Sequence, residues 1–126
     1  MTDDLLTEAK HLAERGWLPG IYVAVGATTV GNTMNVAPRL YCEDHPQDPT
    51  TEADLHLAAT KEIDNRGWIA VRNRKFMYIA ILTGGTEFEK KGSWFRFEEH
   101  GTTTLSLLRC LRAACEEHER NEGAKR

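Results

Sequence analysis

The chain has 126 residues, a formal net charge of −3, 40% apolar residues and 28% charged residues. This length suits a single domain over residues 1–126 with one core, and the composition is that of a globular rather than a disordered protein. No apolar run is long enough to span a membrane. The negative charge argues against binding of long nucleic acids, which requires a basic face.

The N-terminus and the cysteines favour a cytoplasmic protein. Residues Met1 to Asp4 are acidic and lack the basic and apolar stretches of a signal peptide. Cys42, Cys110 and Cys115 are an odd number of cysteines, which favours reduced thiols. Buried, small apolar side chains are the simplest role for them.

The first part of the chain predicts a helix and then two strands. Thr2 can cap a helix that ends at Arg15, where a glycine follows. Residues 21–25 are rich in β-branched side chains and predict a strand, which residues 28–30 could extend. Gly31-Asn32 suits a tight turn, and residues 33–41 predict a second, weaker strand, restricted to a sheet edge by its proline.

The second part predicts a helix, three strands and a last helix. Thr51 to Asp54 fit a capping box, and Arg66-Gly67 ends the helix that starts there. The strands are expected at residues 68–72, 76–83 and 93–98, and one of the threonines at 102–104 begins the last helix. Residues 76–83 are apolar on both alternating faces, which predicts a central strand covered on both sides.

This order of elements predicts an α+β fold. We expect a mostly antiparallel sheet of four or five strands with helices packed on both faces, an α-β-α sandwich. Residues 118–126 are expected to form a charged tail that frays.

Two arginines on the last helix are the main candidates for ligand binding. Arg109 and Arg112 leave the same border of its apolar stripe, in the first half of the helix, where the dipole is positive. Such a pair suits a phosphate, which arginine can bind in a bidentate manner. The alternatives are a side chain whose stem covers the core, or an ion pair with an acid such as Glu98 or Glu116.

Further ligand contacts could come from aromatic residues and from a third arginine. Trp94 and Phe88 lie near the last helix in sequence and could stack a base, although core packing is the alternative for both. Arg39 could also reach a ligand. The glycine-containing segment before it, residues 26–32, does not match a phosphate-binding loop.

Metal binding and catalysis have weak sequence support. Cys42, Asp44 and His45, with the later His56, supply half of a zinc pattern and no second pair at the right spacing, so we expect no metal. No serine or cysteine signature marks a nucleophile, and we expect no enzyme. A ligand-cleaving enzyme would need a general base near the arginines, for which His100 is the nearby candidate.

Three short motifs in the second half of the chain carry a family resemblance. They are a helix exit, Asn65-Arg66-Gly67-Trp68, an aromatic strand, Trp94-Phe95-Arg96-Phe97, and a last helix with arginines among small and leucine residues, Thr104 to Ala114. With these motifs the stretch from Ala53 to Cys115 resembles the phage ABA sandwich domain family.

The resemblance implies a function. Some proteins of similar size and layout are phage anti-defence proteins that sequester cyclic ADP-ribose isomers of the Thoeris system. Some also bind the cyclic oligonucleotides of CBASS, and they act as oligomers without catalysis. The resemblance implies a nucleotide pocket near the last helix and the last hairpin. In this pocket Arg109 and Arg112 would bind phosphates, and Phe88 or Trp94 would stack on the base. The resemblance implies no cofactor.

The sequence therefore predicts a phage-encoded binder of a cyclic nucleotide signal, a homo-oligomer in the host cytoplasm. The alternative is a small phage protein that acts through protein–protein contacts, as an inhibitor or a structural component. This alternative predicts an exposed apolar patch.

Overall fold

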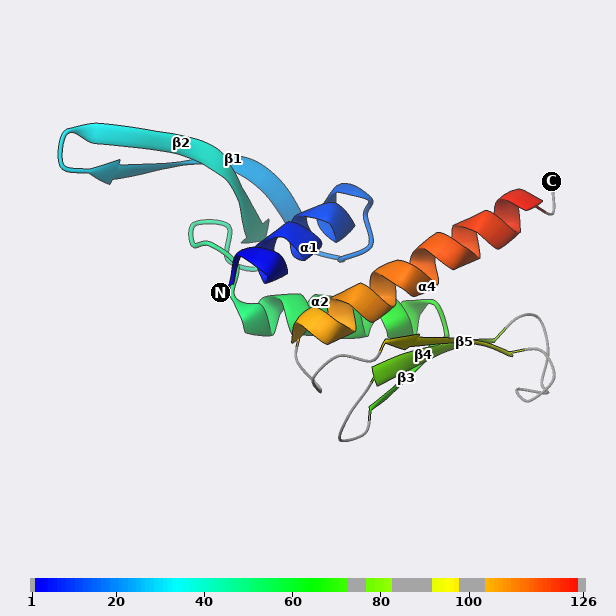
Figure 1. Cartoon of the computed structure of the whole chain (residues 1–126). Helices are drawn as coiled ribbons and strands as arrows, with labels where there is room; N and C mark the ends of the chain where they lie inside the picture. Colours follow the sequence, from blue (N-terminus) through cyan, green and yellow to red (C-terminus); the bar gives the residue numbers. More distant parts are fainter. Residues whose placement is uncertain (1, 73–76, 83–91, 98–103, 125–126) are drawn as a thin grey trace.

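The computed structural model describes residues 2–72, 77–82, 92–97 and 104–124 (Figure 1). This part of the chain contains three helices and five strands, which confirms the α+β class. In chain order they are α1 (Asp3–Glu14), β1 (Ile21–Val30), β2 (Thr33–Cys42), α2 (Glu52–Asn65), β3 (Ile69–Arg72), β4 (Met77–Leu82), β5 (Gly92–Phe97) and α4 (Thr104–Ala124). No helix in this part of the chain is long and apolar enough to cross a membrane.

The first two helices begin and end at the predicted residues. The Thr2 hydroxyl caps the first turn of α1, and Thr51 and Asp54 form a complete capping box on α2. After each helix a glycine has positive φ, 74° at Gly16 and 72° at Gly67, a conformation that other residues rarely adopt. Local sequence signals are therefore sufficient to place these two helices.

The strands all pair antiparallel, but they form two sheets rather than one. β1 pairs with β2 over its whole length, from Ile21 opposite Cys42 to Val30 opposite Thr33. β3, β4 and β5 form a separate sheet with β4 in the middle, so the predicted central strand is confirmed as central. The outer edge of β2 is occupied at its base, where Leu40 accepts a hydrogen bond from the backbone N–H of Thr50 at 3.0 Å. The loop that follows β2 therefore takes a place where another strand would pair.

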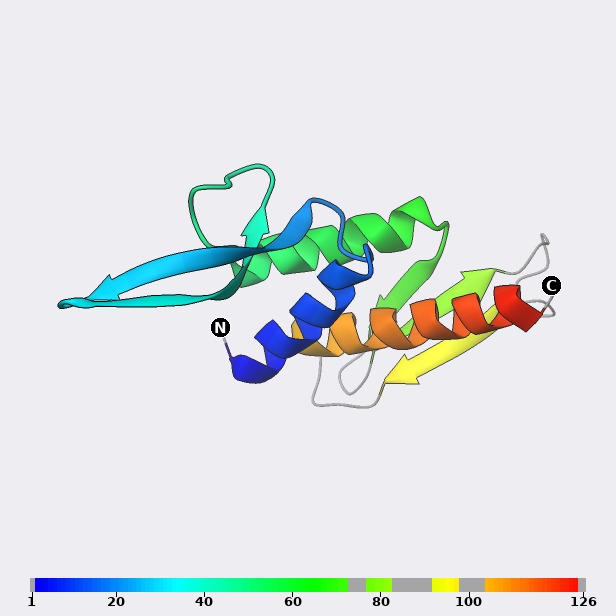
Figure 2. The same ribbon diagram turned by 90° about the horizontal axis from the view of Figure 1, so that it is seen from above.

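The helices form the middle layer of the described structure. α2 and α4 lie side by side on one face of the three-stranded sheet, and α1 packs against α4 on the side away from that sheet (Figures 1 and 2). The expectation was a sheet with helices on both faces. In the part that the structure describes, α2 and α4 share one face of the three-stranded sheet, and α1 packs on α4 rather than on the sheet.

The core lies between these layers and reaches the base of the β1–β2 hairpin. Its largest fully buried side chains are Leu12, Leu18, Leu55, Leu108 and Leu111. The last helix extends to Ala124 and so includes residues 118–124, which were expected to fray. Arg120 pairs with Glu117 one turn earlier, which supports the helix in this stretch.

Candidate functional sites

The β1–β2 hairpin, residues 21–42, extends away from the helices as an arm (Figures 1 and 2). Residues directly opposite each other in an antiparallel pair lie on the same face, and successive residues alternate between faces. The pairing register therefore puts ten residues on one face, which we call the apolar face of the arm: Ile21, Val23, Val25, Ala27, Thr29, Met34, Val36, Pro38, Leu40 and Cys42. Thr29 is its one polar member.

The apolar face is buried at the base of the arm and uncovered toward the tip. Ile21 and Leu40 are only 6% and 3% exposed because they belong to the core. Val25, Met34 and Val36 are 71%, 65% and 60% exposed. A continuous apolar surface of this kind on a globular protein marks an interaction site.

The opposite face of the arm carries polar groups and rings. Tyr22 and Tyr41 stack there with ring centroids 5.9 Å apart. Arg39, the single charged residue of the arm sequence, lies across Gly26, where a Cβ atom would come within 2.8 Å of the arginine Cδ. Gly26 thus permits the close approach of Arg39 and Tyr41 to the backbone.

A pocket of about 310 Å³ opens between α1 and the base of β2. Two cationic residues line it, Lys10 and Arg39, together with Thr50 and an apolar wall that includes Leu6, Pro38, Leu40 and Pro49. Its volume is at the lower end of the range for small-ligand sites, roughly 300 to 1,000 Å³.

Arg109 and Arg112 of α4 are half-buried, and Arg112 has an acidic partner on α1. The Nε atom of Arg112 lies 2.8 Å from Glu8 Oε1, close enough for an ion pair. The partner is therefore not Glu116, one of the acids suggested by the sequence. Arg109 also interacts with other groups of the protein. A phosphate at Arg112 would have to compete with the Glu8 carboxylate.

The other predicted ligand residues do not join these two. Arg39 belongs to the arm and lines the pocket together with Lys10. Trp94 lies in β5, where the structure describes the backbone but not the side chain. Phe88 and His100 lie outside the described residues, as does Glu98, the other suggested ion-pair partner.

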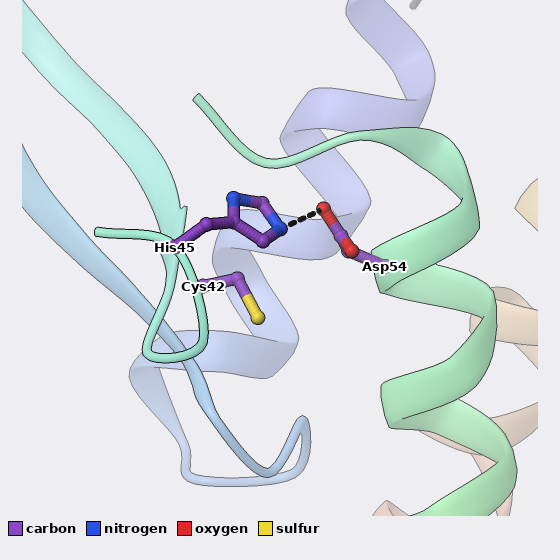
Figure 3. A group of neighbouring side chains, drawn as sticks. All are labelled: Cys42, His45 and Asp54. Carbon is purple, nitrogen blue, oxygen red and sulfur yellow. Dashed lines mark ion pairs between the residues drawn. The ribbon is translucent and has the colours of Figure 1, made fainter. Parts of the chain in front are cut away.

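A thiol, an imidazole and a carboxylate lie close together where the end of the arm, the loop 43–51 and the start of α2 come together (Figure 3). Cys42 Sγ, a ring nitrogen of His45 and a carboxylate oxygen of Asp54 all lie within 4.8 Å of one another. The sequence pointed to Cys42 and His45, but with Asp44 and His56 beside them. Asp54 was predicted only as a helix cap, and its position in the capping box is the signal that it points back toward the loop.

Hydrogen bonds hold the carboxylate of this cluster in its charged form. The backbone N–H of Thr51 donates to Asp54 Oδ2 at 2.9 Å, which is the largest cause that lowers the pKa of Asp54 to about 2. His45 Nε2 lies 2.9 Å from the same oxygen, and this contact raises the pKa of His45 above its usual value. The loop is therefore fastened to α2 by a charge-assisted pair.

No protein family, curated protein or solved structure matches this chain. These comparisons therefore give no support to the resemblance to the phage ABA sandwich domain. The nucleotide ligand and the residues assigned to it remain proposals.

Proposed function

We propose that the protein works through protein–protein contacts, with the apolar face of the arm as its contact surface and a second copy of the chain as its first partner. One observation carries this proposal: an apolar face that begins in the core and ends with side chains 60% to 71% exposed. Covering such a surface contributes about 25 cal/mol for each Å² of apolar area removed from water.

The composition of the arm supports a second copy as the partner. Its single charged residue, Arg39, lies on the opposite face, so two apolar faces can meet without charge repulsion. Two-fold contacts between identical surfaces are the commonest form of assembly. A two-stranded hairpin alone is only marginally stable, and packing two arms face to face, about 10 Å apart, stabilises both.

Neighbouring positions on β2 offer a matched test. Val36 lies on the apolar face and Asn35 on the opposite face, and both are exposed. We expect Val36→Lys to weaken self-association at least about tenfold, equivalent to about 1.4 kcal/mol, because a charge would be buried in an apolar contact. Asn35→Lys should associate as the unmodified protein does. Light scattering on a sizing column measures the mass of each.

The proposal fails if both lysine variants and the unmodified chain have the same mass at every concentration. Circular dichroism serves as the control, since neither substitution touches the core. A variant that has lost its fold is replaced by Val25→Lys, which lies on the same face.

A second candidate is a phage-encoded anti-defence protein in the host cytoplasm that sequesters a cyclic nucleotide signal without cleaving it. The pocket beside β2 favours this candidate. Lys10 and Arg39 can bind phosphate oxygens, and the apolar wall formed by Leu6, Pro38 and Pro49 can cover a base. Arg109 and Arg112 of α4 are a second location for the same ligand, with Glu8 as a competitor at Arg112.

Incubation with cyclic ADP-ribose isomers and cyclic oligonucleotides, followed by heat release and chromatography, tests the second candidate. We expect intact nucleotide from the unmodified protein and no loss in Arg120→Gln, a control on the exposed end of α4. Loss in Arg39→Gln assigns the ligand to the pocket, and loss in Arg109→Ala assigns it to α4. Absence of uptake contradicts the candidate, and a changed product would indicate an enzyme.

A further inference from the structure

We propose that Cys42, His45 and Asp54 form a binding site for a divalent transition-metal ion of the Zn²⁺ type. Thiolate, imidazole and carboxylate are the three ligand types that Zn²⁺ takes in proteins. The three candidate ligand atoms lie within 4.8 Å of one another (Figure 3). Bond lengths of about 2.0 to 2.3 Å put the ligands of a tetrahedral ion roughly 3 to 4 Å apart, so a contraction of at most about 2 Å completes the geometry. This site goes beyond the proposed function and does not depend on it.

The backbone holds the three ligands in place before any ion binds. Cys42 ends β2, paired with Ile21. The backbone N–H of His45 donates to the Cys42 carbonyl at 3.1 Å, which fixes the turn between these two ligands. Asp54 is held in the first turn of α2 by the capping box with Thr51. An ion here would join the arm, the loop and α2.

The hydrogen bonds of Asp54 leave room for metal coordination. Every contact that the structure shows to this carboxylate within the described part of the chain, from Thr50, Thr51 and His45, uses Oδ2. An ion can therefore bind Oδ1 while the cap of α2 persists. On binding, His45 Nε2 gives up its proton and its contact with Asp54, and the Cys42 thiol loses its proton to solvent.

The cluster also has an open side where a fourth ligand can bind. A pocket of about 250 Å³ is lined by Cys42 and Asp54, with Asp44 on the same wall. A water molecule or the Asp44 carboxylate can complete a tetrahedral ion from this side. Glu43 also lines the pocket and adds negative charge, which attracts a cation, while Lys61 on the wall opposes it.

Titration of the full chain with Co²⁺ alone, followed by Zn²⁺ competition, tests the site. Cys110 and Cys115 are only 1% and 0% exposed, whereas Cys42, 8% exposed, lines a pocket and has His45 and Asp54 beside it. A thiolate-to-cobalt charge-transfer band therefore reports Cys42. We expect this band at one equivalent, with tetrahedral cobalt absorption, and its loss when Zn²⁺ is added. Addition of Zn²⁺ should also raise the thermal unfolding temperature.

The decisive variant is His45→Gln, because this half-exposed side chain can be changed without disturbing the core. We expect a loss of at least about tenfold in affinity, and loss of the charge-transfer band in Cys42→Ser. His56→Gln, a half-buried histidine of α2 outside the cluster, is the matched control and should bind as the unmodified chain does. Lack of a charge-transfer band in the unmodified protein, or equal affinity in His45→Gln, would overturn the proposal.

Discussion

Burial sets the chemistry of the three cysteines. Cys115 is fully buried, and burial raises the pKa of its thiol to about 12, so the reactive thiolate is scarce at neutral pH. Cys110 is also buried, on the same helix. Cys42 is 8% exposed and lines a pocket beside α2.

We therefore expect iodoacetamide at pH 8 to label Cys42 first in the metal-free protein. Cys110 and Cys115 should be labelled only on unfolding, because both thiols are buried and the pKa of Cys115 is also raised. Mass spectrometry of proteolytic fragments after timed labelling gives the rate at each site. Labelling of Cys115 as fast as Cys42 would contradict this account.

Single residues could be predicted from the sequence where their role is local. The cap at Thr51 and Asp54 is contained in four consecutive residues and is confirmed. The partner of Arg112 was not predicted, since Glu8 is on another helix and only the packing of α1 against α4 brings the two together. In the same way, Asp54 lies near Cys42 because the loop 43–51 brings the start of α2 back to the end of β2.

At the scale of the helix, the capping box of α2 makes a testable contribution to stability. Thr51 Oγ1 accepts a hydrogen bond from the Asp54 N–H at 3.3 Å, which satisfies one of the free donors at the helix start. We expect Thr51→Ala to lower the free energy of unfolding by about 1 kcal/mol.

Thr60→Ala is the matched control for this substitution. Thr60 is exposed on the same helix, and its hydroxyl donates only to the carbonyl of His56, which the helix already uses. Its loss should change stability little, since alanine has the higher helix propensity. Urea unfolding compares the two variants, and equal losses would show that the cap has no special role.

The elements themselves were largely predictable, whereas their grouping was not. Helix starts and strand residues follow from short-range patterns, and both the turn at Gly31 and the central position of β4 are confirmed. The strands form two sheets, and the base of the outer edge of β2 pairs with the loop, where the Thr50 N–H donates to the Leu40 carbonyl. That contact is set by the path of the loop. The last helix is also longer than expected: residues 118–124, predicted as a fraying tail, continue α4.

At the scale of the whole molecule, the arm carries the exposed apolar surface on which the proposed function depends. The sequence alternative of a contact protein predicts an exposed apolar patch, and the structure has one on the arm, at Val25, Met34 and Val36. Alternation in residues 21–42 alone does not reveal this face. Its continuity depends on the pairing register, which places Val25 opposite Pro38 and Val36 opposite Ala27.

Sedimentation equilibrium of the unmodified chain over a wide concentration range measures whether the arm joins two copies. The arm account predicts an apparent mass that rises from the monomer value of 14.2 kDa toward twice that value as concentration increases. The metal-free protein should be used, so that the measurement reports the arm alone. A mass that stays at the monomer value throughout would contradict the account.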